Sequence, residues 1–592
     1  MPLLFWDIET RSAVLLEEAG PWRYAGAATT EVLCVGYARD NDRPATWTPG
    51  EPIPAEFIEA ANNPDWCIVA HNAQFERAIA TRILEPRFGL PKVSLRQQVC
   101  TMTLALASAL PGALDSATKA LGLPYQKDHE GYLLMKQMSR PRRARKGEDR
   151  NAIHWVDGPE LRQRIHRYCM HDVEIERAVF HRLPPISKAE HEVWQLDAVI
   201  NERGFHVDCK LARAAREVAR GELGLINAEI AALTNGEITS VHQAERIKDY
   251  IQRHGHTLTT LTKRSVGTVL AHDPCDQIRR LLELRRDGAR ASTRKIDRLL
   301  KSVDHDNRLR GTLRFHGSAT GRWSGRGYQP QNLKKPETTD LDAAVGAVLS
   351  GDMARVRTLG APLTITGDVS RSIICAPPGR TLIGGDFSAI ESRILAWLAG
   401  EDGKLENYRA FDRTGDSAFE PYCVTASRIF KRKVTPENES ERNVGKVCEL
   451  AFQYGGGLGA YRRFDSSDAY TDTQVEDFKR EWRHAHPATT RFWRALERAL
   501  HRTVFTCRPD DLDGELAFSF DHDRLLLTLP SGRNLVYPQA CLVAENLKAP
   551  ESSVSKTMRG AAGPTARPGM ACSPRTWCRR LPAICSPLLC SG

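Results

Sequence analysis

The sequence predicts a multidomain protein of mixed α/β and α+β architecture. Its 592 residues are too many for a single hydrophobic core and indicate roughly three or four domains. Strand-like and helix-like patterns alternate up to about residue 185, as in an α/β domain. Residues 187–302 are mostly helical in pattern, and an α/β pattern resumes at Thr381. The predicted domains are residues 1–185, 186–330, 331–545 and 546–592.

Composition and charge exclude some classes of protein. Apolar content is 41% and charged content 26%, both ordinary for a globular chain. No run of 18 apolar residues is present, and residues 1–10 lack the basic start of a signal peptide, so we expect a cytoplasmic protein that does not enter a membrane. The net charge of +10 is weak evidence for a nucleic-acid partner, because residues 546–592 contribute +6 of it. The 15 cysteines lack the paired spacing of a zinc site.

Hydrophobic periodicity places the main elements. In the first domain it predicts strands at residues 3–9, 32–38 and 68–70, and helices at residues 74–84 and 161–182. A basic, polar stretch at residues 139–151 predicts a mobile loop. In the second domain, residues 204–208 interrupt the helices as a turn or short strand. Residues 279–301 predict one basic amphipathic helix, whose charged side is either solvated or faces phosphates.

Three acidic segments in the first domain have the residue types of a metal site. Alternation along the first strand places Asp7 and Glu9 on the same face, opposite its apolar residues. Glu76 begins a helix directly after a buried strand. Tyr168 and Asp172 are four residues apart, and so they share one face of a later helix. Several carboxylates are what a pair of divalent cations requires.

In order and spacing, these segments resemble the three motifs of the DEDDy 3′→5′ exonucleases, which have a ribonuclease-H-like fold. The resemblance implies that Asp7, Glu9 and Asp172 are metal ligands and that Tyr168 orients the attacking water. Two Mg²⁺ ions, which Mn²⁺ can replace, would activate the water and stabilise the leaving 3′ oxygen. The family usually has Asp at the position of Glu76. Glu76 can still bind a metal, directly or through water, with its carboxylate displaced by one methylene.

A second set of motifs begins with a predicted strand at residues 381–386 that ends in Asp386 and leads into an amphipathic helix. This segment resembles motif A of the family-A DNA polymerases, which have a right-hand fold of palm, fingers and thumb. The resemblance implies that Asp386 binds both catalytic metals. It also implies that Glu391 blocks a ribose 2′-OH and so selects deoxynucleotides. We expect the strand to be central in an antiparallel sheet.

Arg442, Lys446, Leu450 and Tyr454 recur every four residues and form one slowly winding stripe on a helix predicted over residues 442–455. Cationic residues lie at one end and apolar residues at the other, which suits a nucleoside triphosphate. The segment resembles motif B, the fingers helix of the same polymerases, although bacterial members have Phe or Tyr at the position of Leu450. We expect the stripe beside the motif A carboxylate, in a cleft between palm and fingers.

A third match is the run Ala-Thr-Gly-Arg-Trp-Ser at residues 319–324, followed by Gln331 and Asn332. It resembles the segment with which these polymerases grip the primer–template backbone, and implies DNA contacts by Arg322, Gln331 and Asn332. The resemblance as a whole covers about residues 1–185 and 311–545. The helical stretch between them fits the thumb.

The end of the chain lacks a motif that the polymerase chemistry requires. No His-Asp-Glu turn, the family's motif C, follows Tyr454. The nearest string is Asp521-His522-Asp523, followed by Arg524, and we assign it to a hairpin within residues 516–529. Residues 561–592 have neither helical nor strand periodicity. Shifted by one base, the codons of residues 569–592 can encode HGVLTENVVQAIARDLLAAALLR, which resembles the palm helix before motif C. We infer a frameshift between about residues 546 and 564.

These motifs predict a DNA-directed DNA polymerase with a 3′→5′ proofreading exonuclease, acting in bacteriophage DNA replication in the cytoplasm of a bacterial host. Its expected partners are primer–template DNA and deoxynucleoside triphosphates, and its expected cofactor is Mg²⁺, two ions per active site. The sequence does not point to particular accessory replication proteins. Because motif C is absent, two alternatives stay open: a chain that is only an exonuclease, and a non-catalytic DNA-binding remnant.

Overall fold

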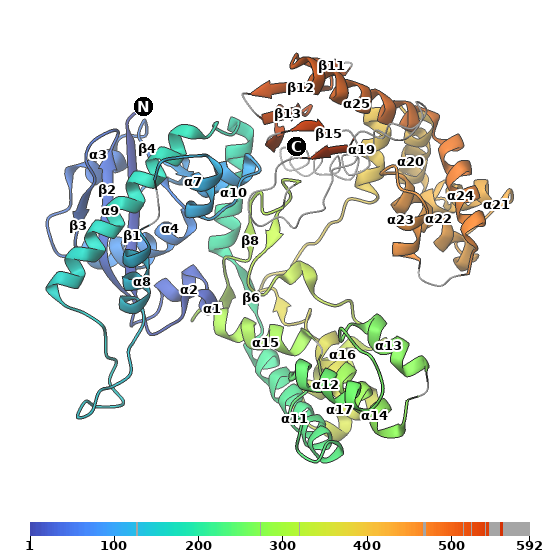
Figure 1. Cartoon of the computed structure of the whole chain (residues 1–592), viewed down its shortest axis with the longest axis horizontal. Coiled ribbons are helices and arrows are strands. Elements are labelled where there is room, and N and C mark those ends of the chain that lie inside the picture. The colour runs from blue at the N-terminus through green and yellow to red at the C-terminus, as the bar shows by residue number, and fades with distance from the viewer. Residues whose placement is uncertain are drawn as a thin grey trace.

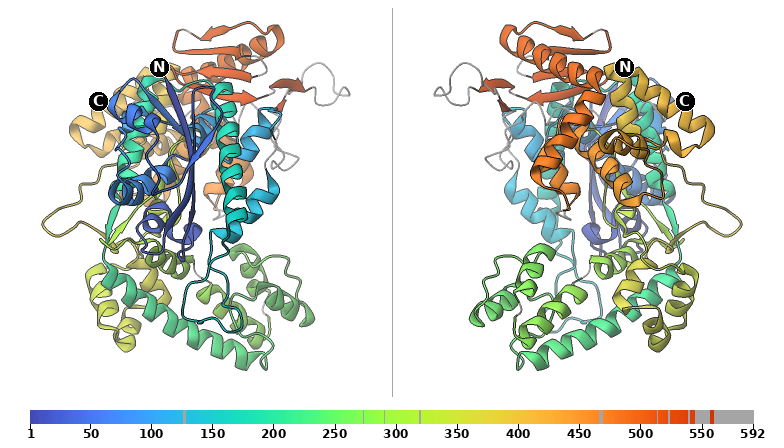
Figure 2. Two further views of the ribbon diagram at one scale, coloured as in Figure 1. Left: turned by 90° about the vertical axis from the view of Figure 1, so that its left-hand side faces the viewer. Right: turned by 90° about the vertical axis from the view of Figure 1, so that its right-hand side faces the viewer.

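The computed structural model describes residues 1–125, 128–272, 274–289, 291–318, 320–465, 469–512, 514–521, 524–538, 540–543 and 557–559. Figure 1 shows three lobes: an N-terminal α/β lobe at the left, a helical lobe at the lower right and a C-terminal lobe at the upper right. The side views of Figure 2 place the helical lobe and the C-terminal strands at opposite ends. Among the described residues, no helix is long and apolar enough to cross a membrane.

The N-terminal lobe is built on a five-stranded sheet of order β3-β2-β1-β4-β5. The strands are β1 (Leu3–Arg11), β2 (Glu31–Arg39), β3 (Ala45–Trp47), β4 (Cys67–Ala70) and β5 (Gln98–Cys100). Strands β3, β2 and β1 are joined by antiparallel pairing, whereas β4 runs parallel to both β1 and β5. The three strands predicted in this domain are therefore confirmed.

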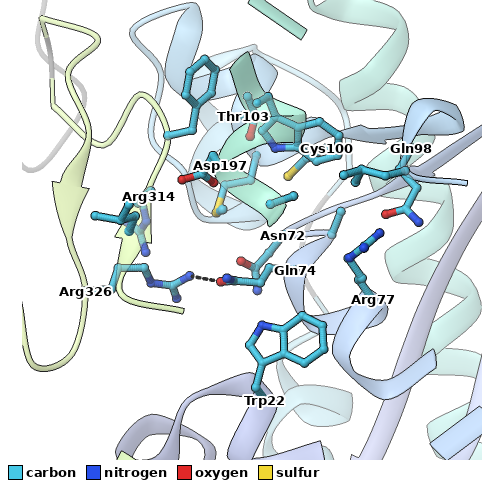
Figure 3. Close-up of a pocket in the computed structure, with 17 residues that line it drawn as sticks. Trp22, Asn72, Gln74, Arg77, Gln98, Cys100, Thr103, Asp197, Arg314 and Arg326 are labelled. Atoms are coloured by element: carbon cyan, nitrogen blue, oxygen red, sulfur yellow. Dashed lines mark hydrogen bonds between the residues drawn. The ribbon is translucent and has the colours of Figure 1, made fainter. Parts of the chain in front are cut away.

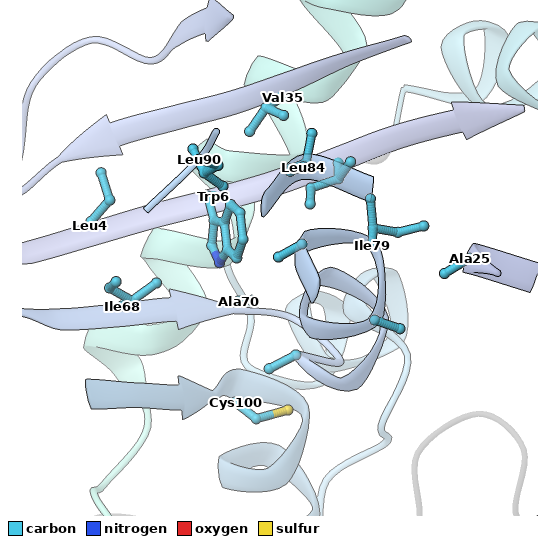
Figure 4. Close-up of a cluster of buried hydrophobic side chains, with 14 of the residues drawn as sticks. Leu4, Trp6, Ala25, Val35, Ile68, Ala70, Ile79, Leu84, Leu90 and Cys100 are labelled. Atoms are coloured by element: carbon cyan, nitrogen blue, oxygen red, sulfur yellow. The ribbon is translucent and has the colours of Figure 1, made fainter. Parts of the chain in front are cut away.

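Helices pack on both faces of this sheet. One face is covered by α2 (Pro21–Ala25), α3 (Ala55–Asn62) and α4 (Gln74–Ile79), which continues as a π-helical turn (Ala80–Leu84), and the other by α9 (Pro159–Arg182). Alternation along β1 determines this arrangement. Leu4 and Trp6 lie in the core beneath α4 (Figure 4), and Phe5 packs with Val173 of α9 on the other side. Both helices predicted in this domain are confirmed.

Shorter elements complete the lobe: α1 (Leu16–Ala19), α5 (Glu85–Phe88), α6 (Thr101–Ala107), α7 (Leu114–Ala120) and α8 (His129–Met138). Residues 139–151 contain no helix or strand beyond one isolated bridge from Arg142 to His154. Within this loop Arg142 pairs with Glu148 at 2.6 Å. The loop is confirmed, and its mobility stays a prediction.

Helix α10 (Lys188–Arg203) leads into the helical lobe, whose remaining elements are α11 (Cys209–Leu233), α12 (Ala244–Arg253), α13 (Lys263–Ala271), α14 (Asp276–Gly288), α15 (Ala291–Ser302), α16 (Leu341–Ser350), α17 (Met353–Leu359) and α18 (Pro362–Asp368). A small sheet of order β10-β6-β7 joins Phe205–Val207, Arg308–Leu309 and Ile374–Cys375. Ala344, Val348 and Ile365 share the core of α11. Because of this packing the lobe continues to β10, beyond the domain boundary predicted at residue 330.

The prediction of one helix over residues 279–301 is wrong, because two helices, α14 and α15, occupy this range. Helix α14 ends at Gly288, where a Cβ would lie 2.7 Å from Val241 Cγ1, so only glycine allows this close approach. The end of α15 docks on the N-terminal lobe, where Lys301 pairs with Glu18 at 2.8 Å. This lysine therefore contacts the N-terminal lobe, whereas the two alternatives for the basic face were solvent and phosphates.

A hairpin of β8 (Leu313–Arg314) and β9 (Ser324–Gly325) is followed by the 3₁₀ turn Pro330–Asn332. The hairpin packs on α10, where the Leu313 amide donates a hydrogen bond to Asn201 Oδ1 at 2.9 Å, and its tip reaches the C-terminal lobe, where Arg322 pairs with Glu391. In Figure 1 the chain then runs from the helical lobe up to the C-terminal lobe.

The C-terminal lobe consists of seven helices and a meander of strands. They are α19 (Ile390–Ala399), α20 (Asp402–Thr414), α21 (Pro421–Phe430), α22 (Glu439–Phe452), α23 (Leu458–Phe464), α24 (Asp472–Ala485), α25 (Pro487–Thr506), β11 (Asp510–Leu512), β12 (Leu516–Asp521), β13 (Arg524–Thr528) and β14 (Asn534–Pro538). The number of helices refers to the part of the chain that the structure describes. The predicted hairpin is confirmed, with Asp521 opposite Arg524. His522 and Asp523 lie outside the described residues.

Of the predicted out-of-frame tail, residues 546–592, the structure describes residues 557–559. Thr557–Arg559 forms β16, which pairs antiparallel with β15 (Cys541–Val543). The rest of the tail lies outside the described residues, so the frameshift stays a prediction.

Candidate active sites

The N-terminal lobe brings three carboxylates together between its sheet and α9. Asp7 and Glu9 come from β1, and Asp172 comes from the middle of α9. Ligand oxygens of the three side chains all lie within 4.8 Å of one another. Within the residues that the structure describes, no other three His, Cys, Asp or Glu side chains place ligand atoms this close. A strand and a helix far apart in sequence thus build one acidic site.

A glycine on the neighbouring strand allows α9 to come this close. Gly36 of β2 is the register partner of Asp7. A Cβ at this position would lie 2.9 Å from Cys169 Sγ and 3.2 Å from the Cys169 carbonyl carbon, both on α9. The Gly36 amide instead donates a hydrogen bond to Cys169 Sγ at 3.2 Å. Because Gly36 has no side chain, α9 packs close enough to bring Asp172 against β1.

Tyr168 lies one turn before Asp172 on the same face of α9 and is 2% exposed. Burial raises the pKa of the Tyr168 hydroxyl, and the charges of Asp172 and Glu9 raise it further. The phenol therefore keeps its proton at neutral pH and can donate a hydrogen bond at the edge of the carboxylate site.

Two further carboxyl groups lie deeper in the lobe. Glu76, in the first turn of α4, is 3% exposed, and burial together with the charge of Asp7 raises its pKa. Glu176 of α9 is 1% exposed, and burial, Asp7 and Glu76 raise its pKa. Glu176 lies outside the motifs that predicted this site. The four-residue spacing from Asp172, which puts both on one helix face, is the signal that would have found it.

The main cavities of the lobe do not contain these carboxylates. One, of about 40 Å³, lies between α4 and the β8–β9 hairpin (Figure 3). Across it Arg326 Nη1 donates to Gln74 Oε1 at 3.4 Å. Asp197, which also lines this cavity, accepts a hydrogen bond from Trp323 Nε1 at 2.8 Å. A second cavity of about 290 Å³ lies between α1 and α15. Both are hollows of the seam between lobes.

The prediction that residues 381–386 form a central strand is wrong. These residues are extended and exposed, with Leu382 at 57% and Ile383 at 97% exposure. A strand requires a hydrogen-bonded neighbour, and none of the described strands pairs with this segment. Asp386 consequently lies on an exposed connection before α19 and belongs to no group of metal-ligand side chains among the described residues.

The helix that follows Asp386 does reach the other polymerase motifs. Glu391 of α19 forms an ion pair with Arg322, which follows the expected DNA-binding glycine. Ser392 donates a hydrogen bond to Glu449 of α22 at 3.3 Å. Ala319, the first residue of that DNA-binding segment, lies outside the described residues. The structure thus joins three predicted motifs through α19, and the position of Asp386 beside the stripe stays a prediction.

The helix predicted over residues 442–455 is confirmed as α22, and its role in the fingers stays a prediction. Arg442 pairs with Glu420 at 2.9 Å, and Lys446 is exposed. Leu450 is half-buried, and Tyr454, just past the helix, packs at the edge of the core beneath the C-terminal strands. The stripe therefore runs from an exposed cationic end to an apolar end, as the spacing indicated.

Glu449, next to Leu450, is a second buried carboxylate that the sequence analysis missed. It accepts hydrogen bonds from Lys404 Nζ at 2.6 Å, Thr425 Oγ1 at 2.7 Å and Trp482 Nε1 at 2.9 Å. Burial opposes its ionisation, but the charges of Lys404 and His486 and the hydrogen bonds from Lys404 and Thr425 together lower the pKa of Glu449. The carboxylate ties α20, α21 and α24 to α22.

The remaining predicted DNA contacts, Gln331 and Asn332, are exposed at the 3₁₀ turn after β9. The backbone carbonyl of Asn332 accepts a hydrogen bond from Lys295 Nζ of α15 at 2.6 Å. Both amide side chains are therefore presented at the surface next to a cation.

Comparison with known proteins agrees with these motifs. The family model described as DNA polymerase family A matches residues 213–506. The DNA polymerase of Bacillus phage SP02 is 32% identical over 548 residues, which cover 91% of this chain and 82% of the relative. The DNA polymerase of Mycobacterium phage D29 is 21% identical over 334 residues, 55% of this chain and 48% of the relative.

Among solved structures, the POL domain of Pol1 from M. smegmatis, in complex with DNA primer–template and dNTP, matches with a TM-score of 0.52. The match covers 90% of this chain and 78% of that one at 14% identity, so it supports the mixed α/β polymerase fold alone. Together with the phage relative, these findings confirm the predicted family. The chain belongs to DNA polymerase family A, whose members are nucleotidyltransferases.

Proposed function

We propose that the N-terminal lobe is a 3′→5′ exonuclease that proofreads for the polymerase. The observation that carries this proposal is the cluster of Asp7, Glu9 and Asp172, whose ligand oxygens lie within 4.8 Å of one another. The sheet order, with three antiparallel strands extended by two parallel ones, supports a ribonuclease-H-like fold. Neither feature depends on the aberrant end of the chain.

The residues of this site fit Mg²⁺, which Mn²⁺ can replace. Both ions prefer carboxylate oxygens, and Glu76 adds a buried oxygen, Oε2, that has no hydrogen-bond partner in the protein. Two bound ions would supply water activation and stabilisation of the leaving 3′ oxygen. Asp7, Glu9, Asp172 and Glu76 would hold them. The neutral phenol of Tyr168 would donate to the attacking water and so orient it.

For the polymerase, the lobes suggest the parts of a right hand. We assign the thumb to the helical lobe, which its packing extends to β10, and the fingers and part of the palm to the C-terminal lobe. Arg442 and Lys446 would contact the triphosphate, Leu450 and Tyr454 the base and sugar, and Glu391 would exclude a 2′-OH. Arg322, Gln331 and Asn332 would contact the DNA backbone, and Asp386 the metals.

The relatives support the biological setting. Two are phage DNA polymerases, and the similar solved structure holds primer–template DNA and a dNTP. We therefore place this chain in phage DNA replication within the cytoplasm of the host, with primer–template DNA and deoxynucleoside triphosphates as its partners.

One observation favours a second function for the chain as written, that of an exonuclease which does not polymerise. Asp386 lies on an exposed segment, and no second carboxylate among the described residues forms a metal group with it. In-line transfer to an α-phosphate uses two metals, and a lone carboxylate cannot place both. We propose that the missing acid belongs to a palm segment that the frameshift has removed.

A nuclease assay tests this proposal. The full chain with Mg²⁺ or Mn²⁺ should shorten a 5′-labelled single strand from its 3′ end. Asp7→Ala should abolish the digestion by removing a carboxylate shared between metals. Asp386→Ala, a matched carboxylate deletion in the other lobe, should leave it unchanged. Undiminished digestion by the Asp7→Ala protein would reject the assignment, and DNA binding without digestion by the unaltered chain would favour the non-catalytic alternative.

A further inference from the structure

Glu76 and Glu176 form a pair of buried carboxyl groups on the inner side of the acidic site. They come from α4 and α9, on opposite sides of the sheet's end, and are 3% and 1% exposed. The charge of Asp7 acts on both, and the charge of Glu76 acts on Glu176. All three groups are therefore within electrostatic reach of one another.

Each member of this pair has an oxygen without a partner. Glu76 Oε2 and Glu176 Oε1 are buried and make no hydrogen bond. Burial is the main cause that raises the pKa of both carboxyls, and the charge of Asp7 raises both further, with Glu76 and Cys100 adding to the effect on Glu176. The one hydrogen bond that acts on Glu176 from another residue comes from the His71 backbone amide, so Glu176 Oε1 and Glu76 Oε2 are each left as a buried oxygen that a cation could compensate.

The position of Glu176 on its helix relates it to the catalytic side chains. Tyr168, Asp172 and Glu176 follow one another at intervals of four residues, so they form one stripe along α9. Glu176 is the most buried member of this stripe, at 1% exposure, and lies one turn beyond Asp172. At position 76, an Asp in place of the Glu would end one methylene short of the present carboxylate.

From these contacts we infer that Glu176 is a fifth carboxylate of the divalent-metal centre and acts with Glu76 on its buried side. The inference rests on the proposed exonuclease function. It assigns a ligand role to a residue outside the motifs of the predicted exonuclease, and it accounts for two buried oxygens that have no hydrogen-bond partner in the protein.

Metal binding by the full chain tests this role without requiring activity. Mn²⁺ titrations followed by electron paramagnetic resonance would compare the unaltered chain with Glu176→Gln, which keeps the size of the side chain and removes its charge. We expect about tenfold weaker Mn²⁺ binding or more, in the range seen when groups supporting a metal site are removed. In chelator, the Gln variant should unfold at the same or a higher temperature, because one buried charge or proton is no longer needed.

The matched control is Glu401→Gln, which alters a buried carboxyl of the C-terminal lobe that accepts a hydrogen bond from the Thr489 amide at 2.9 Å. It should bind Mn²⁺ as the unaltered chain does. Unchanged Mn²⁺ affinity in Glu176→Gln, or a lower unfolding temperature in chelator, would overturn the inference. If Asp7→Asn loses Mn²⁺ while Glu176→Gln does not, the inference alone fails. If the unaltered chain binds no Mn²⁺, the proposed exonuclease fails with it.

Discussion

The acidic site of the N-terminal lobe and the segment around Asp386 differ in how completely the fold supports them. Asp7 and Glu9 lie on a strand that is paired on both sides, and a helix packed against that strand adds Asp172. Asp386 ends a segment of strand-like sequence that has no strand beside it among the described residues. A carboxylate on a strand-like segment is thus positioned to bind a metal only when neighbouring strands pair with that segment.

The largest expected effect is that of restoring the palm segment that we propose the frameshift has removed. We expect the chain as written to extend a primer poorly or not at all. The protein made from the frame-corrected gene should extend it faster by about 10³-fold or more. This is the size of effect expected when an electrostatic group is lost at a reacting phosphate. Primer extension would be measured for both proteins with the exonuclease silenced by Asp7→Ala.

Robust templated extension by the uncorrected chain would contradict this expectation and show that another acid serves Asp386. Completing the sheet should also cover Leu382 and Ile383, whose exposure makes the segment a site for association between chains. Light scattering of the two proteins at equal concentration would measure that difference.

A second test loosens the site that is well supported. Gly36→Ala places a methyl group 2.9 Å from Cys169 Sγ, so α9 must move away from β1 and carry Asp172 with it. We expect the exonuclease rate to fall on the order of 10²-fold, as for other displacements of about 1 Å at a reacting site. Single-strand digestion under single-turnover conditions would measure the change.

The control for this test is Gly224→Ala on α11, where an added Cβ meets no atom within 4 Å. It should leave digestion unchanged. A Gly36→Ala protein as active as this control would mean that the approach of α9 does not set the carboxylate geometry.

The N-terminal site could be predicted because local patterns determine most of it. Alternation along β1, a buried strand before Glu76 and the four-residue spacing of Tyr168 and Asp172 each depend on a few neighbouring residues. The close approach at Gly36 and the burial of Glu176 depend on which helix packs on which strand. Short-range periodicity carries no information about that packing.

The errors have the same cause. Residues 381–386 have the composition of a strand, but β structure requires a partner, and propensity cannot supply one. The lobe boundary expected at residue 330 failed because α16 and α18 return to pack on α11, a long-range contact. Glu449 stands in a helical pattern where only the positions of Lys404 and Trp482 reveal that it is buried and paired.

A third test concerns the stability of the C-terminal lobe, next to which residues 381–386 form no strand. Lys404→Met leaves the fully buried Glu449 carboxylate without its cation. We expect a loss of about 3–5 kcal/mol in the stability of this lobe, the usual effect of breaking a buried pair. Thermal unfolding would show an early transition, whereas single-strand digestion at low temperature should persist.

Lys431→Met is the matched control, because Lys431 pairs with Glu481 at the surface. Exposed pairs contribute less than about 1 kcal/mol, so its transition should barely move. Equal shifts in the two variants would indicate that the network around Glu449 is not a principal support of the lobe.

The smallest expected effect concerns the contact between α10 and the β8–β9 hairpin, where Asp197 of α10 accepts a hydrogen bond from Trp323 beside β9. Burial raises the pKa of Asp197 to about 6, although Trp323 and Asn201 partly oppose the shift. The folded protein therefore holds this proton between about pH 4 and pH 6, where the unfolded chain has released it. Stability should consequently be highest below that window, fall by up to about 3 kcal/mol across it, and be independent of this group above it.

Asp197→Asn tests this sign directly, since the amide oxygen can still accept from Trp323 and does not ionise. The unfolding temperatures of the two proteins should be most alike near pH 4, and the Asn protein should become the more stable one as the pH rises to about 6. Above that pH the difference should stay constant. A difference that grows as the pH falls would mean that the carboxylate is held ionised, so that α10 and the β8–β9 hairpin are joined there by charge and not by a neutral hydrogen bond.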